Sequence, residues 1–220
     1  MLQRIHILAR RLDLQLAPAS TTDFPAIAEL SRVSFSELIS PPGPGLDCTR
    51  YDPTWCLSDR RAIRRVTVAF APSGALVAYA FYMIWSAGDV YLTELAASAG
   101  AARVPGAASA VLGAMLAEAH ALGCTGRATL NVPRLCRHPA AISSVDLARC
   151  DPVGFYEQFG FEIAEGALGY TSTGEARDWD DTWMEAEIAG ALNRALRRLL
   201  DRLTRDFRPG RTARTHGRAN

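Results

Sequence analysis

Residues 90–122 combine an apolar run, a loop of small residues and a long alanine-rich run. The apolar run Val90–Ala97 predicts a strand, and the apolar periodicity of Gly106–Leu122 predicts a helix that Gly123 ends. The first N–H groups of a helix have no acceptor inside it, and the helix dipole adds partial positive charge there. Because small side chains let a phosphate reach this backbone, the loop at residues 103–108 is predicted to bind an anion.

Hydrophobic patterning places further strands and helices around this unit. The order strand, helix, strand from residue 90 to residue 132 predicts a parallel strand pair joined by a right-handed crossover. The turn residues 72–74 predict an antiparallel hairpin before it. A short basic helical turn is expected at residues 59–65. The other predicted strands are 12–16, 66–71, 76–85, 127–132, 161–165, 169–173 and 183–188, and the other predicted helices are 23–38, 152–159 and 189–207.

Composition narrows the classes that this chain can belong to. With 220 residues, 49% of them hydrophobic, the chain can bury one substantial core. Its 5 cysteines form no C-x-x-C pair, so neither a zinc site nor a disulfide framework is indicated, and no metal is expected. No stretch approaches the ~20 apolar residues of a membrane span, and no signal peptide is recognised. We therefore expect a cytoplasmic location and no membrane partner.

The C-terminal segment is rich in arginine. From Arg194 onward the chain has nine arginines and only two acidic residues. This excess of positive charge would suit binding to a nucleic acid or ribosome, but it also occurs on a solvated helix face. Leucines at helical spacing favour a helix that docks on its own domain or forms a homodimer, so nucleic acid is not the favoured partner; these are Leu192, Leu196, Leu199 or Leu200, and Leu203. We divide the chain into an N-terminal extension (1–11), a main domain (12–188), this helix (189–207) and a basic tail (208–220) that is predicted to be disordered.

Three separated segments share a further property. Tyr91–Ala97, Arg103–Ala108 and Gly154–Phe161 follow one another in the order of three family motifs. They resemble the strand before the pyrophosphate loop, the loop Arg/Gln-x-x-Gly-x-Gly/Ala, and the Phe-Tyr-Glu-x-x-Gly-Phe signature of the GNAT superfamily of N-acetyltransferases. The resemblance covers about Leu12–Ile188. It implies a mixed α/β (α+β) fold, with a mostly antiparallel central sheet splayed at a parallel strand pair and flanked by helices, plus the C-terminal amphipathic helix.

The resemblance also implies a reaction and a co-substrate. Such a protein transfers an acetyl or short acyl group from acetyl-CoA to a primary amine by direct attack, with no covalent enzyme intermediate. It implies that the backbone near two strand residues holds the pantetheine arm and that the loop binds the pyrophosphate mainly by its backbone. Arg103 either adds side-chain charge or is solvated. The implied cofactor-binding residues are Ala96, Ala97, Arg103, Val104, Gly106, Ala107 and Ala108.

Two residues are candidates for acid–base chemistry. Tyr156 matches the tyrosine that in the family often protonates the departing thiolate, and a phenol with a pKa near 10 is a suitable acid; packing beside Phe155 is the alternative. Glu94 is the candidate general base, directly or through a water. A lone carboxylate in an apolar strand is costly to bury unless it is partnered or used. The alternative is a position on a solvated face of the strand.

The acceptor is expected to be a small-molecule or peptide amine. Asn131 lies near the end of a predicted strand where the amine would enter, and it either binds substrate or caps the strand. Asp178 and Trp179, in an acidic turn, suit a cationic amine by charge and by cation–π contact, unless the turn is simply solvated. Pro105 has no N–H, and Arg149 stands where the family usually has Asn. These departures keep a catalytically silent acyl-CoA-binding or regulatory domain as the first alternative, and an RNA- or ribosome-associated protein acting through its tail as the second.

Overall fold

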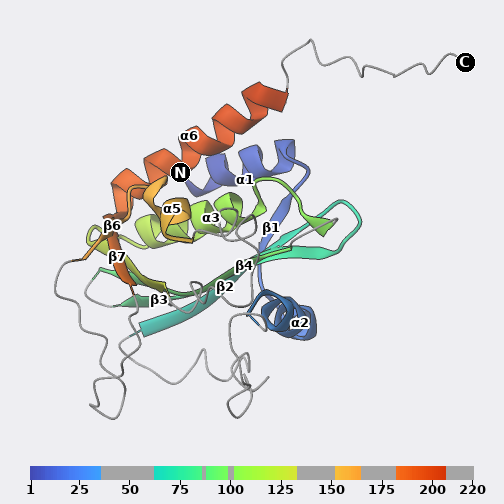
Figure 1. Ribbon diagram of the computed structural model, residues 1–220, viewed down its shortest axis with the longest axis horizontal. Coiled ribbons are helices and arrows are strands. Elements are labelled where there is room, and N and C mark those ends of the chain that lie inside the picture. Colours follow the sequence, from blue (N-terminus) through green and yellow to red (C-terminus); the bar gives the residue numbers. More distant parts are fainter. Residues whose placement is uncertain (36–61, 86–87, 99–101, 133–151, 165–181, 207–220) are drawn as a thin grey trace, which may run out of the picture.

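A central sheet organises the molecule. The computed structural model describes residues 1–35, 62–85, 88–98, 102–132, 152–164 and 182–206. Its 7-stranded sheet has the order β1-β2-β3-β4-β5-β7-β6 (Figure 1). β4 and β5 run parallel, while the other neighbouring pairs are antiparallel, which confirms the predicted mixed sheet. The strands are β1 (Gln15–Pro18), β2 (Ala62–Phe70), β3 (Leu76–Trp85), β4 (Val90–Ala97), β5 (Arg127–Val132), β6 (Glu162–Ile163) and β7 (Thr182–Glu187).

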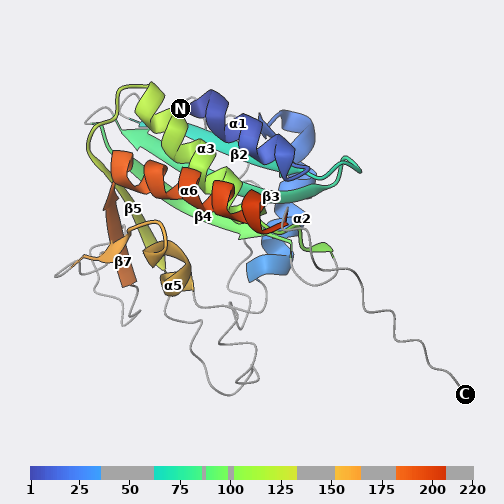
Figure 2. The ribbon, with the colours of Figure 1, turned by 90° about the horizontal axis from the view of Figure 1, so that it is seen from above.

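Helices cover both faces of the sheet. α1, α3 and α6 form a layer over one face, with α5 beside them, and α2 lies on the other face (Figures 1 and 2). The larger hydrophobic core lies between the sheet and the first layer, and a smaller core lies beneath α2. The helices are α1 (Leu2–Arg11), α2 (Phe24–Phe35), α3 (Ala107–Ala121), α5 (Pro152–Glu157) and α6 (Ile188–Asp206), and a short 3₁₀ turn, η1 (Thr21–Asp23), precedes α2.

α3 is buried nearly all round rather than along one stripe. A Cβ atom on Gly113 would lie 3.1 Å from Ile5 of α1 and 3.4 Å from Ala195 of α6. The alanines of α3 permit this close approach, because small side chains let neighbouring helices come near its axis. The N-terminal segment thus packs as a helix in the main core, with Ile5, Leu8 and Ala9 buried.

α6 docks on its own chain. Its buried face includes Leu192, Leu196, Leu199 and Leu203, whereas Leu200 is 42% exposed, which resolves the alternative that the spacing left open. The apolar stripe is thereby used within the chain, and the homodimer stays a prediction. None of the helices in the described part of the chain is both long enough and apolar enough to span a bilayer.

Some element boundaries differ from the sequence prediction. β2 begins at Ala62 and pairs with β3 from the Ala62–Trp85 register onward, so the helical turn predicted for residues 59–65 is wrong from residue 62. The pairing partner, distant in sequence, overrides the local pattern. β1 begins at Gln15 rather than Leu12, because Asp13 takes a positive φ of 56° in the turn after α1. The predicted strand at 169–173 and the basic tail lie outside the described residues.

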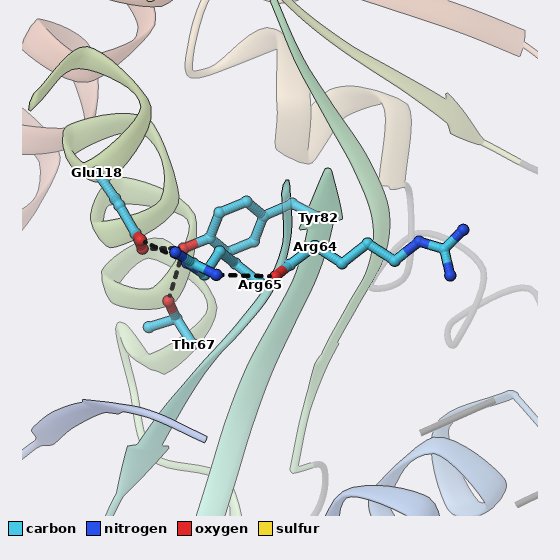
Figure 3. A network of polar contacts seen from close by, with 5 residues as sticks. All are labelled: Arg64, Arg65, Thr67, Tyr82 and Glu118. Atoms are coloured by element: carbon cyan, nitrogen blue, oxygen red, sulfur yellow. Dashed lines mark hydrogen bonds and ion pairs between the residues drawn. The ribbon is translucent and has the colours of Figure 1, made fainter. Parts of the chain in front are cut away.

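A polar network fixes α3 on the sheet (Figure 3). The buried Tyr82 hydroxyl on β3 lies 3.0 Å from Thr67 Oγ1 on β2 and donates a short hydrogen bond to Glu118 Oε2 on α3. Arg65 Nε donates to Glu118 Oε1 at 3.2 Å. Burial first, and the neighbouring Glu118 carboxylate second, raise the pKa of Tyr82 above its ordinary value. The network ties β2, β3 and α3 together near the C-terminal end of α3.

We expect Tyr82→Phe to lower the free energy of unfolding by about 1–3 kcal/mol at pH 7, because it leaves polar groups of the network without a partner. Above pH ~10 the unfolded chain loses the Tyr82 proton while the folded chain keeps it, since the folded pKa is raised. Wild-type stability should therefore fall above that pH, by up to about 1.4 kcal/mol per pH unit for this group. Denaturant unfolding from pH 7 to 11 measures this effect, and an equal alkaline slope in Tyr82→Phe would contradict it.

Candidate active site

The start of α3 lies within one residue of the predicted position. Gly106 is its N-cap, with a left-handed φ of 90° that favours glycine. The first main-chain bond inside the helix runs from the Ala110 N–H to the Gly106 carbonyl at 2.9 Å. The N–H groups of Ala108 and Ser109 precede that bond and therefore have no acceptor within the helix. These two amides can donate hydrogen bonds to an anion, which the dipole of the 15-residue helix would also attract.

The loop before α3 contributes less than its motif implies. The Ala107 N–H already donates to the Val104 carbonyl at 3.2 Å, and Pro105 has no N–H. Val104 packs against the larger core, whereas Arg103 is exposed. Ala107 and Pro105 therefore have no free N–H to offer an anion, whereas Ala108 and Ser109 in the first turn do.

β4 and β5 separate beside this helix start. Their parallel pairing runs from Val90–Ala128 to Leu92–Leu130 and stops there, although β4 continues to Ala97. The register between β3 and β4 shifts at the same place, because Phe81 pairs with Glu94 and Tyr82 with Leu92. Thr93 is thus the extra residue of a β-bulge, which bends the strand. The sheet opens at its parallel pair, as predicted.

The open edge of β4 exposes main-chain groups of alternate residues. The Ser98 N–H donates to the Val77 carbonyl at 2.8 Å, and hydrogen-bonded pairs alternate along an antiparallel ladder. The backbone of Ala96 therefore faces β3, and that of Leu95 and Ala97 faces the side from which β5 has diverged. Among the two predicted alanines, Ala97 is the one placed to hold a ligand by its backbone. Leu95, which the sequence analysis did not select, shares this orientation.

Glu94 is half-buried and held by a tyrosine. The Tyr79 hydroxyl donates to Glu94 Oε2 at 2.9 Å, and Tyr79 is fully buried in the smaller core beneath α2. A carboxylate oriented by a buried donor differs from a freely solvated one, because its direction is fixed before substrate arrives. This arrangement favours the used or partnered carboxylate over the solvated one.

Tyr156 lies on α5 with its ring buried in the larger core. The rings of Phe155 and Phe161 meet its ring edge-on, with centroids 5.1 and 5.7 Å away. Burial raises the pKa of Tyr156, so the hydroxyl keeps its proton throughout the neutral range. Tyr156 thus lies on the face of the sheet that α3 covers, whereas Glu94 is held on the face that α2 covers. The sheet between these faces opens where β4 and β5 separate.

The predicted acceptor residues are only partly described. Asn131 on β5 follows the last residue paired with β4 and stands opposite Trp183 of β7. The Trp183 ring lies 5.8 Å from the Tyr91 ring of β4. This aromatic pair was not predicted, because it depends on β5 pairing with a strand fifty residues later. Asp178, Trp179 and Arg149 lie outside the described residues.

A seven-stranded mixed sheet that opens at its one parallel pair, with a buried helix packed on it, defines a mixed α/β fold. No family model matches this sequence, and a search of curated proteins finds no match. Solved structures do match. This chain has the fold of the GNAT N-acetyltransferases.

Three matching structures represent that fold. Spermidine N-acetyltransferase from Vibrio cholerae, in complex with CoA and spermine, is 18% identical, and the match covers 82% of this chain and 99% of that one with a TM-score of 0.56. Ard1 from Thermoplasma volcanium is 14% identical over 80% of this chain and 97% of that one, with a TM-score of 0.54. An N-acetyltransferase from Staphylococcus aureus Mu50 is 16% identical, with coverages of 80% and 98% and a TM-score of 0.50.

Proposed function

We propose that this protein is an N-acetyltransferase that transfers an acetyl or short acyl group from acetyl-CoA to a primary amine by direct attack. The observation that carries this proposal is the juxtaposition of two features. α3 begins after its N-cap Gly106, with the amides of Ala108 and Ser109 lacking acceptors within the helix, and the neighbouring strand has an open edge at Leu95 and Ala97. The fold that the chain shares with solved N-acetyltransferases supports the same reading.

The described residues fit coenzyme A in two places. The amides of Ala108 and Ser109 at the helix start suit the diphosphate, because they point outward along the dipole. The backbone of Ala97 and Leu95 suits the amide-bearing pantetheine arm, which would add to the open strand edge as a peptide does. Bound acetyl-CoA would supply an activated thioester.

Two side chains of the chain would carry out the proton transfers, one as the acid and one as the base. Tyr156 is protonated at neutral pH and would donate its proton to the departing thiolate; burial raises its pKa, so it is a weaker acid than a solvated phenol until a thiolate develops beside it. Glu94, held by Tyr79, would remove a proton from the attacking amine, directly or through a water. Asn131, one residue beyond the last β4–β5 pair, would bind the acceptor. Amides on the open edge of β4 would stabilise negative charge on the carbonyl oxygen.

The acceptor is a small-molecule or peptide amine. The Vibrio cholerae structure holds spermine, so polyamines belong in a first panel of acceptors. The aromatic pair Tyr91–Trp183 beside Asn131 suits a cationic chain, because aromatic faces attract ammonium groups. Asp178 and Trp179 lie outside the described residues, and we propose them as further contacts to a cationic acceptor by charge and cation–π attraction.

Two measurements test the function. We expect acetyl-CoA to raise the thermal midpoint of the full chain, because a ligand that binds only the folded state stabilises it. Thiol release over a panel of polyamines, other small amines and peptide N-termini should then find an acceptor. Binding of acetyl-CoA without turnover of any amine would favour the catalytically silent acyl-CoA-binding domain. Pro105 and Arg149, which depart from the family pattern, are the residues that favour this alternative. No stabilisation by acetyl-CoA would contradict both proposals.

The nucleic-acid alternative has a test of its own. The apolar face of α6 packs on α3, so this helix is engaged within the chain, while the basic segment 208–220 lies outside the described residues. Deleting residues 208–220 should leave amine acetylation unchanged. Salt-dependent RNA binding that disappears with the same deletion would instead support the RNA- or ribosome-associated protein.

A further inference from the structure

Two arginines of α6 have buried atoms without partners. Arg198 and Arg202 are four residues apart and so share one side of the helix. The Nε atoms of both are buried and make no hydrogen bond in the described structure. A buried guanidinium N–H that makes no hydrogen bond is costly, so its presence calls for an explanation, and a ligand that supplies the missing acceptor is one.

The same side of α6 lies on the start of α3. The two helices run antiparallel, because Ala195 lies near Gly113 and Arg202 lies near Gly106 (Figure 2). A Cβ atom on Gly106 would lie 3.3 Å from Cδ and 3.8 Å from Nε of Arg202. The buried Nε of Arg202 is therefore next to the N-cap whose first free amides follow at Ala108 and Ser109.

The charges around these arginines are poorly balanced. Burial, then Arg205, then Arg202, lower the pKa of Arg198, and Asp201 only partly opposes them. The guanidinium of Arg198 also lies 5.4 Å from the centre of the Phe159 ring, in the turn after α5. Positive charge is thus concentrated between α6, α5 and the start of α3, where an anion would relieve the mutual repulsion.

We propose that Arg202, together with Arg198, binds the diphosphate of the acyl-CoA substrate from the side opposite to the α3 amides. A guanidinium offers paired N–H donors that match two phosphate oxygens, and in this position it replaces the one donor that Pro105 removes from the loop. The α6 helix thereby becomes part of the co-substrate site rather than an appendage. This inference rests on the proposed function, because the diphosphate is that of coenzyme A.

Arg202→Gln in the full chain tests this assignment, with Arg197→Gln as its matched control. Both changes remove one positive charge from α6, but Arg197 is exposed. We expect Arg202→Gln to weaken CoA binding by about 10- to 100-fold, the usual effect of losing a hydrogen bond to a charged group. Arg197→Gln should change it less than about twofold. Isothermal titration with CoA, 3′-dephospho-CoA and inorganic pyrophosphate measures these affinities.

The expected pattern separates a phosphate contact from a structural role. Affinity for 3′-dephospho-CoA, which keeps the diphosphate, should fall by the same factor, whereas turnover of S-acetyl-pantetheine, which has no phosphate, should be unchanged. The thermal midpoint without ligand should be equal or higher, because a repulsive charge is removed, and Arg202→Lys should be intermediate. Equal losses with CoA and S-acetyl-pantetheine, or unchanged affinity for 3′-dephospho-CoA, would overturn the assignment. If wild-type protein does not bind CoA, the proposed function fails; if it does and Arg202→Gln binds equally well, only this inference fails.

Discussion

Replacing Tyr156 with Phe is expected to lower kcat by about 100-fold or more, within the range of 10²–10⁴ typical of a lost general acid. The change removes one oxygen and keeps the ring, whose edge contacts with Phe155 and Phe161 hold α5 in place. The affinity for CoA should therefore change less than threefold. Single-turnover measurement of thiol release, at saturating acetyl-CoA and amine, reports the chemical step directly.

Tyr82→Phe is the matched control for this result. It deletes a hydroxyl from another buried tyrosine, in the network with Thr67 and Glu118 near the C-terminal end of α3. We expect it to lower stability and leave kcat unchanged. If Tyr156→Phe keeps more than half of wild-type kcat, Tyr156 is a packing residue, and the thiolate must take its proton from water or another group.

Glu94→Gln is expected to lower kcat/KM for the amine by about 100-fold or more at pH 7. The substitution keeps the size of the side chain and its contact with the Tyr79 hydroxyl, but it removes the basic oxygen. The deficit should shrink as pH rises, because an increasing share of the amine is then already deprotonated in solution. Profiles of kcat/KM against pH from 6 to 10 for wild type and Glu94→Gln measure this convergence.

Two further variants make the Glu94 result specific. Glu187→Gln removes an exposed carboxylate near the end of β7 and should leave the pH profile unchanged. Tyr79→Phe should produce a smaller loss than Glu94→Gln, because it releases the carboxylate from its donor without removing it. A constant deficit at all pH values would contradict the role of general base and leave Glu94 as a residue that only positions the strand.

Local patterns predicted the parts of this fold whose contacts are close in sequence. The strand 90–97, the helix after Gly106 and the hairpin around Gly74 follow from apolar periodicity, a glycine cap and turn residues, which act over a few positions. Boundaries failed where a distant partner decided them. β2 reaches back to Ala62 only because β3, beyond the turn, continues to Trp85 and offers it hydrogen-bonding groups.

The candidate site divides in the same way. The resemblance to a known family predicted Tyr156 and Glu94 as site residues, and the sequence pattern placed the helix start within one residue of Ala107. Only the tertiary structure showed which backbone groups face the open edge at Leu95 and Ala97, because the parity of a ladder depends on its register. The contact between Arg202 and Gly106, almost a hundred positions earlier, also needed the tertiary structure. Charge and spacing along α6 describe that helix, but they do not identify the surface on which it docks.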